Sequence, residues 1–157
     1  LNRSAAATPV LLVIDLDDLR VCPAALIQSW LGAPRSPNLL FRIAVAEIES
    51  WLLADGVGLA RYLGIGAGLV PKRPDEIANP KQELVNLARR SRRRDLRDDL
   101  VPGAGSTARV GPAYNATMVR FVTDQWNAER AASASPSLSR AVSCLADYAS
   151  AASTSFL

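Results

Sequence analysis

Two unbroken apolar runs stand in the first third of the chain, at residues 10–14 and 39–45, with Arg42 the one charged residue in the second run. Neither run alternates apolar and polar residues, which is typical of parallel strands buried on both faces. Between them, residues 23–31 carry apolar side chains at helical spacing and open on Pro23, which favours a first helical turn. The pattern predicts an α/β protein with a parallel sheet flanked by helices.

The rest of the chain has the periodicity of helices. Helices are predicted at 47–55, at 55–64 with Asp55 as the cap, from Asn79-Pro80, from Pro112 to Trp126, and from Ser135-Pro136 to residue 148. Residues 101–109 are predicted to be a loop, residues 128–135 a small-residue linker, and the tail after 148 to fray. The C-terminal half is therefore expected to be helix-rich.

Two parallel strands do not make a stable sheet, so at least one more strand is expected. The chain begins at Leu1 rather than Met, and the missing strand is expected either upstream or unrecognised within the chain. With 157 residues, the chain is predicted to be one domain over 1–157, with a core at 10–64 and a helical part at 75–150.

Composition excludes several classes of chemistry. There is no His, which removes imidazole metal sites, Ser-His triads and Cys-His dyads. Cys22 and Cys144 are far apart, so neither zinc spacing nor a disulfide framework is present, and a reducing cytoplasm is expected. No apolar run reaches the ~20 residues of a membrane helix, so no membrane association is expected.

Acidic residues follow both predicted strands. Asp15 and Asp17 lie two residues apart at the end of the first strand, where they project to the same side and where α/β sheets collect their ligands. Paired carboxylates need a cation between them, and Mg²⁺, with Mn²⁺ as a substitute, prefers such oxygens. Glu47 and Glu49 follow the second strand, and Glu49 lies among apolar residues, so it needs a partner or a metal. The alternatives are a solvated acidic turn and a Glu stabilised by a helix dipole.

Basic residues form two further candidates. Lys81 falls in the first turn of its helix, where a cation opposes the helix dipole, so contact with a phosphate is one explanation. Taken alone, the placement is explained better by a solvated surface lysine. A run of arginines follows and is a candidate nucleic-acid contact. Its members are Arg89, Arg90, Arg92, Arg93 and Arg94. Asp95, Asp98 and Asp99 come directly after this run and could pair with part of it instead.

Several segments together resemble the Toprim-like domain-of-unknown-function family 4276. They are the strand ending in Asp15-x-Asp17, the stretch from Ile48 to Asp55 (Ile-Glu-Ser-Trp-Leu-Leu-Ala-Asp), Asn79-Pro80-Lys81, Gly111-Pro112-Ala113-Tyr114, and the helix from Ser135. The resemblance spans residues 10–148, and the stretch that contains Glu49 is its most specific part.

The resemblance implies a Toprim-like sheet and the chemistry of Toprim nucleases. Asp15, Asp17 and Glu49 would bind Mg²⁺, Lys81 and Glu49 would be catalytic, and the activity would be metal-assisted phosphodiester hydrolysis. Relatives occur beside AAA or ABC-type ATPases in phage defence, so such a partner is implied. The Glu of the first Toprim strand has no counterpart here, which leaves either an upstream strand or a catalytically degenerate copy.

Two other readings remain open. Residues 13–18 also resemble the first motif of haloacid-dehalogenase phosphatases, in which Asp15 would be the nucleophile and Asp17 the general acid. Leu19 stands where those enzymes usually have Thr. Alternatively, the domain is a non-catalytic module whose arginines bind nucleic acid or an acidic partner.

Overall fold

The computed structural model describes residues 2–16, 20–31 and 34–154. Strands β1 (Val10–Leu16) and β2 (Leu39–Val45) pair in parallel, with Val10 opposite Leu39 and Leu16 opposite Val45. Helix α1 (Pro23–Leu31) makes the crossover between them. Both predicted strands and the predicted crossover helix are therefore confirmed, and the chain has the α/β class expected from its apolar runs.

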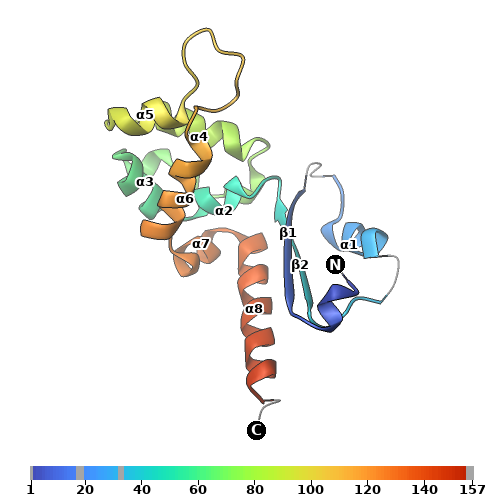
Figure 1. Cartoon of the computed structure of the whole chain (residues 1–157). Coiled ribbons are helices and arrows are strands. Elements are labelled where there is room, and N and C mark those ends of the chain that lie inside the picture. Colours follow the sequence, from blue (N-terminus) through green and yellow to red (C-terminus); the bar gives the residue numbers. More distant parts are fainter. Residues whose placement is uncertain (1, 17–19, 32–33, 155–157) are drawn as a thin grey trace.

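Helices cover both faces of this sheet (Figure 1). On one face, Leu26 and Ile27 of α1 pack against a cluster that includes Phe41 and Ile43 of β2. On the other face, the long helix α8 (Pro136–Thr154) buries Leu138 and Ala141 in a cluster with Ala44 of β2. In a strand covered on both faces, polar residues at alternate positions would be buried, which explains the unbroken apolar runs.

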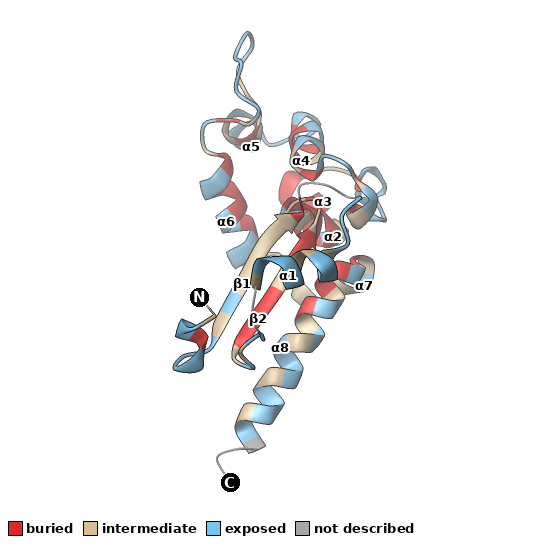
Figure 2. Ribbon diagram, turned by 90° about the vertical axis from the view of Figure 1, so that its right-hand side faces the viewer, coloured by how far each residue is buried: buried red, intermediate tan, exposed pale blue. Residues whose placement is uncertain are grey.

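The two strands differ in burial (Figure 2). Most of β2 is buried, whereas β1 is mostly half-buried and Leu11 remains 49% exposed. The described residues contribute two strands to the sheet, so the third strand expected from the sequence is not among them.

A helical layer follows the sheet. It contains α2 (Glu49–Ala54), α3 (Gly56–Leu63), α4 (Pro80–Arg89), α5 (Arg94–Leu100) and α6 (Tyr114–Asp124), with short 3₁₀ turns at Ala67–Leu69 and Pro74–Glu76. A further 3₁₀ turn, Ser4–Ala6, precedes β1, and its Ala5 packs in the sheet cluster. These helices share one apolar core, in which Leu59, Leu84 and Phe121 are almost fully buried. Within the described residues, no helix is both long and apolar enough to cross a membrane.

Three predictions about the C-terminal half are wrong in detail. The expected linker is a helix, α7 (Ala128–Ala134), because Ala is the best helix former and the Asn127 side chain caps its start by accepting from Arg130 N–H. Helix α6 ends at Asp124, so Trp126 lies beyond it. Helix α8 continues to Thr154 instead of fraying after residue 148.

Candidate functional site

The site lies where both strands end. Directly after β2, Ala46 adopts a left-handed backbone conformation with φ of 64° and forms a bridge to Leu16 at the end of β1. A non-glycine residue in this region is strained, and such strain is concentrated at functional positions. The turn brings the backbone N–H of Ile48 within 2.7 Å of Asp15 Oδ1, to which it donates. Asp15 therefore anchors the segment that carries Glu47 and Glu49.

Glu49 is the centre of the cluster. The residue is only 5% exposed, although it begins α2 and carries a carboxylate. Lys81 Nζ lies 3.3 Å from Glu49 Oε1, and the Tyr114 hydroxyl donates to the same oxygen over 3.3 Å. Glu49 Oε2 is also buried, and among the described residues it has no hydrogen-bond partner. A buried acceptor that lacks a partner is costly, so this oxygen is available to a cation or a donor.

Tyr114 remains a hydrogen-bond donor at any physiological pH. Its burial raises the pKa of the phenol strongly, and the charge of Glu49 and the hydrogen bond to it raise the pKa further. A negative phenolate beside a buried carboxylate would be repelled, so the neutral hydroxyl is the stable form. Tyr114 thus fixes the orientation of Glu49.

Glu47 binds the start of α4. Its Oε2 accepts from the backbone N–H of Lys81 over 2.9 Å, and its Oε1 lies 4.0 Å from Lys81 Nζ. Asn79 precedes the helix as predicted, but its side chain makes no capping hydrogen bond. The Glu47 carboxylate, which is distant in the chain, therefore accepts the hydrogen bond from Lys81 N–H that a capping side chain would otherwise accept. Glu47 also helps to line an open pocket of about 250 Å³, together with Asn79, Lys81, Gln82 and Arg109.

The predicted metal ligands are only partly brought together. Asp15 at the end of β1 accepts from the backbone N–H of Ile48, which precedes Glu49 in the chain, whereas Asp17 is outside the described residues. Across the part of the chain that the structure describes, no three acidic or thiol side chains gather closely enough to hold an ion. The chemistry of the donors still suits a hard cation, because they are carboxylate oxygens and Glu49 Oε2 lacks a partner.

The arginine run lies away from this cluster and does not occupy a single helix. Helix α4 ends at Arg89 and α5 begins at Arg94, so the intervening residues form a turn. All five arginines are exposed. Arg93 pairs with Asp95 at 2.8 Å and Arg94 with Asp98 at 3.6 Å, as the acidic residues after the run suggested.

Two functional candidates were not identified from the sequence. Tyr114 ends one of the segments that carry the resemblance but had no role assigned to it, and no local signal indicates that its hydroxyl reaches a carboxylate 65 positions away. Arg109 belongs to the loop predicted at 101–109, and only the fold brings it to the pocket beside Lys81. Contacts between such distant positions depend on tertiary packing.

No protein-family model matches the chain, and no curated protein or solved structure matches it. The resemblance to the Toprim-like family therefore stays a prediction.

Proposed function

We propose that the chain is a Toprim-like domain that hydrolyses phosphodiester bonds of nucleic acid with the help of Mg²⁺. The observation that carries the proposal is the buried Glu49 carboxylate, which has one oxygen that no described residue hydrogen-bonds and the other beside Lys81. Burial of a carboxylate is expensive, and a protein gains nothing from an unsatisfied oxygen unless that oxygen binds something.

The cation would be held by Asp15, Asp17 and Glu49, with Mn²⁺ able to replace Mg²⁺. When bound, such a cation supplies an activated water and offsets charge on the scissile phosphate. Lys81 would contact the phosphate and stabilise its charge, since its ammonium group already lies in the acidic cluster. Tyr114 would hold Glu49 in position through its hydrogen bond.

The proposed substrate is nucleic acid, bound through its backbone by some of the exposed arginines near the junction of α4 and α5. Phosphate contacts position a strand without reading its sequence. A cytoplasmic location and a partner ATPase of the AAA or ABC type belong to the same proposal. Cys22 and Cys144 are free thiols, which is compatible with a reducing compartment.

The test combines metal binding with cleavage. Mn²⁺ binding would be measured by calorimetry, and cleavage of labelled DNA and RNA oligonucleotides would be followed with Mg²⁺ or Mn²⁺. We expect Glu49→Gln to lower metal affinity and cleavage by ~100-fold or more, since it removes a charged ligand. The matched control is Glu129→Gln, an exposed Glu on α7, which should change neither. Circular dichroism would establish that both variants fold.

A wild-type protein that neither binds Mn²⁺ nor cleaves any oligonucleotide would contradict the proposal. Unchanged metal affinity in a folded Glu49→Gln protein would contradict the assigned ligand.

A second function is favoured by one contact. Lys81 lies 3.3 Å from Glu49 Oε1 and already compensates its charge, so the domain could bind phosphates without cutting them. In that case oligonucleotides would bind in the presence of EDTA with unchanged affinity, and no metal-dependent products would form. The same two assays separate the two functions.

A further inference from the structure

Helix α4 has one exposed face that connects the acidic cluster with the arginine run. Gln82 and Arg89 lie seven positions apart, so they point to the same side of the helix. The distance along the axis from Lys81 to Arg89 is about 12 Å at 1.5 Å per residue. We call Lys81, Gln82 and Arg89, with the facing Arg109, the α4 face.

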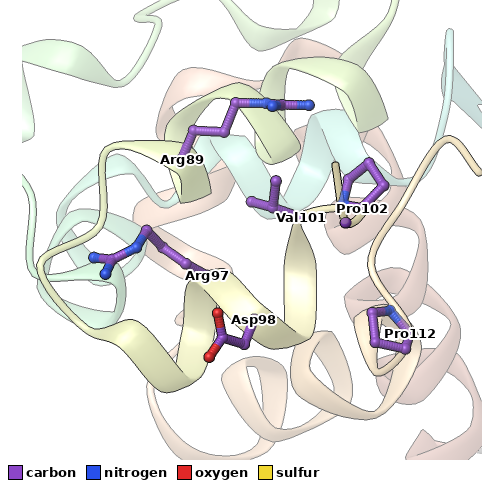
Figure 3. A pocket seen from close by; sticks show the side chains of 7 residues that line it. Arg89, Arg97, Asp98, Val101, Pro102 and Pro112 are labelled. Carbon is purple, nitrogen blue, oxygen red and sulfur yellow. The ribbon is translucent and has the colours of Figure 1, made fainter. Parts of the chain in front are cut away.

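Each end of the α4 face opens into a pocket. At the N-terminal end, the pocket described above lies between Lys81, Gln82 and Arg109. At the C-terminal end, a pocket of about 410 Å³ is lined by Arg89 with residues of α5 and of the loop that follows it. Figure 3 shows Arg89 projecting from α4 beside Val101 and Pro102, with Arg97 and Asp98 on the neighbouring helix. The same helix and the same loop therefore line both pockets.

The two arginines of the α4 face are free to bind a ligand, whereas Lys81 pairs with Glu49 and Glu47. Within the described ranges, Arg89 and Arg109 are exposed and neither forms an ion pair or a side-chain hydrogen bond. The two carboxylates that line the pockets already have partners. Glu47 accepts from Lys81 N–H, and Asp98 pairs with Arg94. Arg89 and Arg109 therefore carry positive charges that no described carboxylate pairs with, although Glu83 of α4 lies beside Arg89 in a further hollow.

The residues that line both pockets suit a phosphate backbone rather than bases. Neither pocket has an aromatic side chain on which a base could stack, and stacking supplies most base contacts to single strands. Two unpaired guanidinium groups, by contrast, are suited to phosphate oxygens. The 12 Å between the ends corresponds to about three to four nucleotides at ~3.4 Å per nucleotide of a strand.

We infer that the α4 face holds the phosphodiester backbone of a nucleic acid along α4, from the Arg89 pocket to Lys81 and the Glu49 cluster. The inference rests on the proposed function. It adds the course that the nucleic-acid backbone takes along α4 and the residues that contact it. It assigns the contacts to Arg89 and Arg109, and it excludes Arg92, which belongs to the same arginine run but lines neither pocket.

The test measures binding in EDTA, so that it does not depend on a metal or on cleavage. Fluorescence anisotropy with labelled single-stranded and duplex oligonucleotides would be recorded from 50 to 200 mM salt for the full chain. We expect Arg89→Ala and Arg109→Ala each to weaken binding about threefold or more. Each should also lower the slope of log K against log salt by ~0.7 for a single strand or ~0.9 for a duplex, the loss of one phosphate contact.

Two matched controls distinguish binding along the α4 face from binding that depends only on the positive charge of the whole surface. Arg92→Ala removes an exposed arginine of the same run, and Arg140→Ala removes one on α8. Both should leave the salt slope unchanged, and the double variant of Arg89 and Arg109 should lower it by about two contacts. Equal losses for Arg92→Ala and Arg89→Ala would overturn the inference, as would unchanged binding in the double variant.

The inference and the proposed function can fail separately. If binding depends on Arg89 and Arg109 in a protein that never cleaves, the proposed backbone path is supported and the proposed hydrolysis is contradicted. If cleavage persists when both arginines are replaced, the proposed activity is supported and the proposed backbone path is contradicted.

Discussion

Asp55 is the most fully paired buried charge among the described residues, and its loss should destabilise the helical layer. The side chain is completely buried between α2 and α3. Arg130 donates to it twice, from Nε at 2.8 Å and from Nη2 at 2.7 Å. The backbone N–H groups of Gly58 and Asn127 donate to it at 3.0 and 2.9 Å. Asp55 therefore caps α3 and also ties it to α7.

Asp55→Ala should cost about 3 kcal/mol of unfolding free energy. The lost cap at Gly58 costs ~1 kcal/mol, and the orphaned N–H of Asn127 costs ~1–2 kcal/mol. The Arg130 side chain is 46% exposed and can turn to water, so the lost pair adds only ~1 kcal/mol. For a chain of this size, the sum lowers Tm by ~10 °C.

The same residue makes stability depend on pH. Burial alone would raise the pKa of the Asp55 carboxyl, but hydrogen bonds from Arg130, Gly58 and Asn127 and the charge of Arg130 together lower it. A lowered folded pKa stabilises the protein above the unfolded value of about 3.9, and this stabilisation is lost as the pH falls through the folded pKa. The free energy of unfolding of Asp55→Asn should therefore lie below that of the wild type by a constant amount above about pH 5. The difference should become smaller below about pH 4.

Urea unfolding followed by circular dichroism between pH 7 and pH 3 would measure both effects. Glu76→Ala is the matched control, because Glu76 pairs with Arg73 at 3.0 Å but both side chains are largely exposed. That exposed pair should contribute less than ~0.5 kcal/mol. If Asp55→Ala cost no more than Glu76→Ala, the reasoning about burial and capping would be refuted.

Two further substitutions test backbone geometry by the same unfolding measurement. Ala46→Val should destabilise by ~2 kcal/mol because a β-branched residue does not tolerate φ of 64°, whereas Ala46→Gly should stay near neutral; equal effects of the two would contradict this. Gly111→Ala should cost ~1–3 kcal/mol, since its Cβ would lie 2.3 Å from the Asp99 carbonyl oxygen. Gly66→Ala, where a Cβ meets nothing within 4 Å, is its control, and a similar loss there would contradict the argument.

Local sequence predicted the elements whose signals are local. The apolar runs predicted both parallel strands, because burial on two faces leaves no room for polar residues. Asp55 predicted the cap of α3, and Gly64 predicted its end, where the backbone adopts φ of 64°. The burial of Glu49 also followed from its apolar neighbours. In each case a few adjacent residues carry the physical cause.

Tertiary structure decided what depends on distant residues. Glu47 replaces Asn79 as the partner of the first turn of α4, and Tyr114 reaches Glu49 across 65 positions. Ala131 of α7 is fully buried against Trp51 and Leu138, and its own segment does not indicate these partners. The sequence determined which side chains could be charged, buried or capping. Only packing decided which of them meet, since the free energy of a contact between distant residues appears only after the chain between them has folded.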